Sequence, residues 1–152
     1  MGAVYFYHLT ESPAEAALRM LLPRALAQGW RVELRGRTDE TMAALDRALW
    51  KGAPTDFLAH GRAGGDHDAD QPVLLTAGEP AANAPACLMS VEGADVTVAE
   101  AAALERVCIL FDGHDPGAVE TARAQWKTLT GAEIAAQYWA QEDGQWTKKA
   151  ES

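Results

Sequence analysis

Two cations and a tryptophan lie close together in the stretch TARAQWKTLTG, residues 121–131. Arg123 and Lys127 are four residues apart, so a helix places them on one side, at the edge of the apolar stripe to which Trp126 belongs. Such a surface could hold carboxylates beside an apolar ring. Spacing alone favours a simpler interpretation, a solvated helix face whose cations lie toward the helix C-terminus.

A second group of polar residues follows an apolar run in FDGHDP, residues 111–116. Asp112, His114 and Asp115 stand where α/β proteins often carry catalytic groups, just beyond a strand. However, Asp115 is expected to cap the next helix, and no nucleophile with a partnered base can be named. The first strand is followed by HLTESPAE, which has no glycine to cradle a phosphate. A small nucleotide-binding or hydrolytic α/β enzyme is the alternative function, and it rests on the position of Asp112 and His114 beyond a strand.

Possible metal ligands and thiols carry weaker signals. The segment GDHDAD places Asp66, His67, Asp68 and Asp70 together, but no bidentate glutamate follows at the spacing of a calcium loop. A solvated acidic loop is the favoured interpretation, and we expect neither a metal nor a cofactor. Cys87 and Cys108 fall in apolar runs, which indicates two buried, unreactive thiols.

Apolar runs alternate with helical patterns along the chain. Strands are expected near residues 3–9, 31–36, 72–76, 86–91 and 106–111, and helices near residues 13–29, 38–50 and 115–131. Ser12, Thr38 and Asp115 are the expected helix caps, and Pro23 should kink or divide the first helix. Residues 51–71 are rich in Gly, Pro and Asp and read as a long loop, and Asp143-Gly144 is a hairpin signal in the tail.

This alternation predicts a fold of the α/β class. We expect one domain, residues 1–152, built as a three-layer α/β/α sandwich with a largely parallel, Rossmann-like central sheet of about five strands. Such a fold by itself indicates no function.

Charge and hydropathy limit the classes of partner. The chain has 22 Asp and Glu against 13 Lys and Arg, a formal net charge of −9, and its pI is near 4.8. Direct nucleic-acid binding, including stacking of single strands on the tryptophans, would need a basic groove and is not expected. The N-terminal residues lack a leader pattern and no apolar stretch is long enough to span a bilayer, so a cytoplasmic protein without membrane contact is expected.

Segments along nearly the whole chain resemble the chi subunit of bacterial DNA polymerase III holoenzyme. These segments are VYFYHL, LDRALW followed by DFLAHG, PVLL, ARAQWK and YWAQEDGQWTKK. They follow one another in the family's order and spacing, and YWAQEDGQWTKK is the most specific of them. The resemblance implies a non-catalytic α/β subunit of the clamp-loader complex. Its implied partners are the acidic C-terminal tail of single-stranded-DNA-binding protein and the small psi subunit.

The resemblance also implies which residues bind these partners. The family's tail pocket uses basic residues and an aromatic at positions that match Arg123, Trp126 and Lys127, which makes the polar patch a candidate seat for an acidic peptide. A further basic position of that pocket is Val119 here, so Lys148 or Lys149 is considered as its replacement. The region of Trp50, Phe57 and Leu58 is the possible psi interface, with ordinary packing as the alternative.

Overall fold

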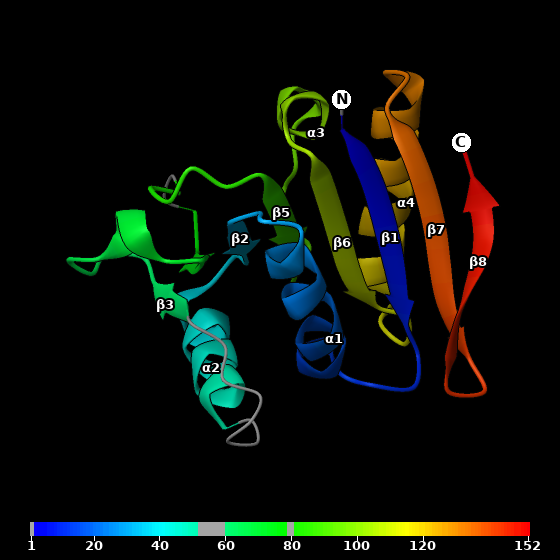
Figure 1. Cartoon of the computed structure of the whole chain (residues 1–152). Helices are drawn as coiled ribbons and strands as arrows, with labels where there is room; N and C mark the ends of the chain where they lie inside the picture. The colour runs from blue at the N-terminus through cyan, green and yellow to red at the C-terminus, as the bar shows by residue number, and fades with distance from the viewer. Residues whose placement is uncertain (1, 52–59, 79–80) are drawn as a thin grey trace.

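The computed structural model describes residues 2–51, 60–78 and 81–152, and these form one eight-stranded sheet with helices against it (Figure 1). The strand order is β3-β4-β2-β5-β6-β1-β7-β8, and every neighbouring pair is parallel except β7 with β8. The strands are β1 (Ala3–Leu9), β2 (Val32–Arg35), β3 (His60–Arg62), β4 (Val73–Thr76), β5 (Cys87–Ser90), β6 (Arg106–Asp112), β7 (Ala135–Glu142) and β8 (Gln145–Glu151). The helices are α1 (Ala14–Ala27), α2 (Asp39–Trp50), α3 (Val98–Ala103) and α4 (Pro116–Gly131), with a short 3-10 turn, η2 (Asp68–Asp70).

Two hydrophobic clusters lie on the two faces of this sheet. Along β1, Val4 and Phe6 join one cluster while Tyr7 and Leu9 join the other, as expected for side chains that alternate across a strand. The buried residues of α1 and α2 belong to the cluster of Tyr7, and those of α3 and α4 belong to the cluster of Phe6. The helix that carries the candidate site therefore covers the opposite face of the sheet from α1.

The α/β class and the largely parallel sheet are confirmed, but the sheet is wider than the expected five strands. The five predicted strands are present as β1, β2, β4, β5 and β6. In addition, β3 adds to one edge, and the tail adds β7 alongside β1 and then turns back as β8. The turn at Asp143-Gly144 is confirmed, since both residues have positive φ, 51° and 75°, as a tight hairpin turn requires.

Helix caps largely follow the expected residues. The Thr38 side chain accepts a hydrogen bond from the Thr41 amide at the start of α2, and the Asp115 carboxylate accepts from two amides at the start of α4. In α1 the expected cap is wrong, because Pro13 occupies the cap position and Ser12 instead accepts from the Gln141 side chain, 2.7 Å away. Helix α1 continues through Pro23 as one element.

The segment expected to be a loop, residues 51–71, contains local structure within its described part, residues 51 and 60–71. Strand β3 pairs with β4, and the Asp68 carboxylate accepts hydrogen bonds from the amides of Gly64 and Gly65 at 2.8 and 3.0 Å. In the described part of the chain, no three His, Cys, Asp or Glu residues gather closely enough to hold a metal ion. Among the helices of these same residues, none is long and apolar enough to cross a membrane.

Candidate protein-binding site on helix α4

Helix α4 presents Arg123 and Lys127 to solvent on one side. Both side chains are exposed, and neither forms an ion pair within residues 2–51, 60–78 and 81–152. The helix is held in place from its buried side by Ala122 and Leu129, which pack into the cluster of Phe6. Since no described residue pairs with them, these two cations are available to an anionic ligand.

Trp126 supplies an aromatic wall next to these cations. Its half-buried ring meets Phe6 edge to face, with centroids 5.3 Å apart, and it lies 6.1 Å from the ring of Tyr138 on β7. Edge-to-face aromatic pairs are favourable and restrict ring orientation. The part of Trp126 that is not buried thus remains as a rigid apolar surface beside Arg123 and Lys127.

Tyr138 and His8 extend this wall from the sheet. The Tyr138 hydroxyl lies 2.7 Å from Nδ1 of His8, and the His8 ring stacks on Phe111 at 5.0 Å. Burial raises the pKa of the Tyr138 hydroxyl, while the positive charge of Arg123 acts in the opposite direction. Burial also lowers the pKa of His8, which favours the neutral form of this ring. The positive charge of Arg123 also acts to lower the pKa of His8.

Gly113 allows this arrangement because it leaves room for His8. A Cβ at position 113 would lie 2.1 Å from Nε2 of His8 and 2.9 Å from the Thr10 methyl group. Any larger residue would displace the ring that holds Tyr138. The glycine after β6 therefore has a packing role at this site.

Val119 and the two lysines considered as its replacement, Lys148 and Lys149, each have local contacts. Val119 is half buried and packs into the cluster of Phe6. Lys148 lies opposite Trp139 across the β7–β8 pair, and Trp139 packs on the α1 side of the sheet. Lys148 forms an ion pair with Glu151 at 3.4 Å, and Lys149 with Glu142. The charges of both lysines are already balanced within the hairpin.

The polar residues at and beyond the end of β6 form hydrogen bonds with nearby backbone groups. Nε2 of His114 lies 2.8 Å from the carbonyl oxygen of Thr10, and Asp112 accepts from the His114 amide at 2.9 Å. These residues line a cavity of about 840 Å³ at the carboxyl ends of the strands. Asp115 caps α4, so the three groups weighed for acid-base chemistry in the alternative function all have structural partners.

Most of the possible psi interface lies outside the residues that the structure describes. Phe57 and Leu58 lie outside the described residues, and Trp50 is the last residue of α2. Nearby, buried His60 of β3 places Nε2 3.2 Å from an Asp46 carboxylate oxygen, which ties β3 to α2.

Sequence reasoning identified the residues on α4 but not their neighbours on the sheet. Tyr138 lies in the tail segment YWAQEDGQWTKK, and His8 lies 130 residues earlier, in the first predicted strand. They meet because β1 pairs in parallel with both β6 and β7, with Phe6 beside Tyr138. The sequence shows an aromatic segment near each end of the chain, but it does not specify that these segments pair or in which register.

A comparison with protein-family models identifies a family that matches most of the chain. The model of the DNA polymerase III chi subunit, HolC, covers residues 1–137. The match includes Arg123, Trp126 and Lys127 and ends one residue before Tyr138, so the whole tail segment YWAQEDGQWTKK lies beyond it. A comparison with curated proteins finds no match. Members of the matched family are non-catalytic accessory subunits of DNA polymerase III, and this chain belongs to the DNA polymerase III chi subunit family.

Proposed function

We propose that this chain links single-stranded-DNA-binding protein to the clamp-loader complex of DNA polymerase III by binding the acidic C-terminal tail of that protein. The observation that carries the proposal is the exposed pair Arg123 and Lys127, without ion-pair partners in the described part of the chain, beside the aromatic wall of Trp126 and Tyr138. Carboxylates require cations with free donors, and a terminal aromatic ring requires an apolar surface.

The net charge of −9 makes the local contacts of Arg123 and Lys127 decisive for binding an acidic tail. An acidic chain repels an acidic tail at long range, so binding depends on short-range contacts that are partly protected from water. Arg123 offers a planar fork of donors for a carboxylate, and Lys127 offers a compact charge one helical turn away. Together they would place two acidic groups of the tail at about the rise of one turn, roughly 5 to 6 Å.

The test is calorimetric titration with a peptide that carries the last residues of single-stranded-DNA-binding protein. Arg123→Ala and Lys127→Ala should each weaken binding by about 1.5 to 3 kcal/mol, because each removes a charge-assisted contact. Arg47→Ala is the matched control, since Arg47 is also an exposed arginine on a helix but lies on α2. Equal affinity of all four proteins for the peptide would show that the tail binds elsewhere.

We further propose that the region of Trp50, Phe57 and Leu58 binds the psi subunit on the clamp-loader side. This proposal rests on the family resemblance and on the position of Trp50 at the end of α2. Co-purification with psi should be lost for Leu58→Asp and retained for Lys127→Ala. Retention of psi by Leu58→Asp would assign that partner to another surface.

A further inference from the structure

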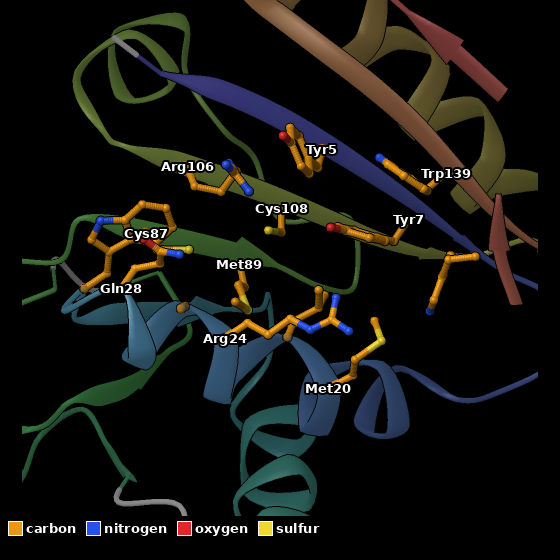
Figure 2. A pocket seen from close by; sticks show the side chains of 14 residues that line it. Tyr5, Tyr7, Met20, Arg24, Gln28, Cys87, Met89, Arg106, Cys108 and Trp139 are labelled. Carbon is orange, nitrogen blue, oxygen red and sulfur yellow. The ribbon is translucent and has the colours of Figure 1, made fainter. Parts of the chain in front are cut away.

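A second hollow lies on the α1 side of the sheet, away from Arg123. Its volume is about 440 Å³, within the range of sites that hold a small ligand or one anchoring side chain. Helix α1 forms one wall, Trp139 and Trp146 of the β7–β8 hairpin form the other, and β1, β5 and β6 form the floor. Figure 2 shows Arg24 reaching from α1 toward the Tyr7 side of this hollow, and Arg106 rising from β6 beside Tyr5.

The charges of this α1 hollow are all positive. Arg24 and Arg106 line it, and no aspartate or glutamate does, although the chain has 22 acidic residues. Neither arginine has an ion-pair partner within the described ranges. A hollow of this charge in an acidic protein is complementary to an anionic ligand.

Arg106 is held ready for such a ligand. Its guanidinium lies 4.0 Å from the centroid of the Tyr5 ring and 5.6 Å from that of Trp30, so cation–π contacts fix its plane. Its Nε is buried and has no hydrogen-bond partner among the residues that the structure describes. A buried donor without an acceptor is costly, and a carboxylate that approaches the edge of the guanidinium could supply the acceptor after a small shift of the side chain.

The floor of the hollow is apolar and adaptable. Tyr7, Met89 and Cys108 are buried there, and Met20 lies half buried at the α1 wall. Thioether and thiol side chains adapt to irregular apolar ligands, and indole rings favour large apolar or aromatic partners. The hollow thus combines a seat for one large apolar group with two cations at its edge.

The position of the hollow disfavours a phosphate group. Phosphates bind where helix N-termini direct free amides at them, whereas this hollow lies along the C-terminal half of α1, from Met20 to Gln28. Two arginines are also few for a nucleic-acid backbone, which needs an extended row of cations. A carboxylate fits the site better, because it has fewer oxygens and less charge than a phosphate, and one arginine can satisfy it through two parallel hydrogen bonds.

We propose that the α1 hollow is a docking site for a segment of another protein that carries carboxylates next to one large apolar side chain. It would be separate from the α4 site, which lies on the other face of the sheet. The chain would then hold two protein segments at once, one on each face, which goes beyond the function proposed above.

Indole resonances distinguish the two sites, because Trp30, Trp139 and Trp146 belong to the α1 hollow and Trp126 to α4. The probes are blocked eight-residue peptides, acetyl-Gly-Ser-Asp-Asp-X-Asp-Gly-Ser-amide, with X as Phe, Trp or Leu, added to ¹⁵N-labelled full-length protein. We expect at least one probe to shift the three hollow indoles while that of Trp126 stays unchanged. Replacing the aspartates of the probe with asparagine should weaken binding at least tenfold.

The matched variants are Arg24→Gln and Arg123→Gln. Arg24 is exposed, so its substitution leaves the fold intact, and it should weaken the probe at least tenfold while Arg123→Gln has no effect. The inference is overturned if no probe moves the hollow indoles, if Arg24→Gln binds as tightly as the parent chain, or if single-stranded oligo-dT moves them at lower concentration than the peptides do. None of these outcomes depends on whether the α4 site binds the tail.

Discussion

Substitution of Glu100 by glutamine should destabilise the protein at neutral pH and lose its effect in acid. Glu100 closes a capping box with Thr97 at the start of α3, and its carboxylate bonds Nη2 of Arg35 at 2.6 Å. Arg35 also bonds buried Glu33, with Nε to Oε2 at 2.8 Å. Helix α3 packs against α4 and β1, so this ion-pair network supports the helix that carries the candidate site.

The magnitude follows from the protonation of Glu100. The hydrogen bond from Arg35 lowers the pKa of Glu100 from 4.5 to about 2, and each pKa unit corresponds to about 1.4 kcal/mol. The full difference is roughly 3 kcal/mol. Since 32% of the Glu100 side chain faces solvent, screening reduces the expected loss for Glu100→Gln to about 1.5 to 2.5 kcal/mol at pH 7.

The sign of the pH dependence is fixed by the lowered pKa. A carboxylate whose pKa is lower in the folded state than in the unfolded state stabilises the folded protein. This contribution is fully present above the pKa of the unfolded state, near 4.5, and disappears as the pH falls toward 2. The free energy of unfolding, measured with urea from pH 7 to pH 2, should therefore differ between parent and variant at pH 7 and converge in acid. Glu105→Gln is the control, because Glu105 is exposed and should change stability by less than about 0.5 kcal/mol. A loss for Glu100→Gln that is constant with pH would refute the reasoning.

Two further predictions concern packing and the thiols. Gly113→Ala should lower the free energy of unfolding by about 1 to 3 kcal/mol and weaken tail binding, because the new Cβ collides with His8. Gly131→Ala, where a Cβ has open space, should leave the free energy of unfolding in urea unchanged or raise it. Cys87 and Cys108 are buried, and the hydrogen bond with Cys87, together with burial, raises the pKa of Cys108. A thiol reagent should therefore modify neither cysteine in the native protein and both in urea; rapid native modification would contradict the burial.

Local signals predicted the elements that carry the candidate site. The cap at Asp115 and the proline after it define the start of α4, and helical spacing then determines that Arg123 and Lys127 share a side. The hairpin at Asp143-Gly144 follows from residues that tolerate positive φ. These features depend on a few neighbouring residues, so the sequence contains them directly.

Features that depend on distant pairings were not predictable in the same way. The tail was expected to form two extended pieces, but nothing in it specified that β7 would pair in parallel with β1 and so place Tyr138 beside Phe6. Helix α3 was missed although its capping box, Thr97 with Glu100, was present, because six residues give too short a helical period to recognise. The α1 hollow likewise forms from one helix and five strands that are far apart in sequence.

A charge-exchange experiment tests the central claim most directly. Lys127→Glu should weaken binding of the acidic tail peptide of single-stranded-DNA-binding protein, because it replaces an attraction with a repulsion. A set of tail peptides, each with one acidic residue replaced by lysine, should contain one member that binds Lys127→Glu more tightly than it binds the parent chain. Calorimetry on both proteins gives the coupling energy. We predict a restored affinity for that one pair, and a parallel loss for every peptide on both proteins would contradict a tail seated at Lys127.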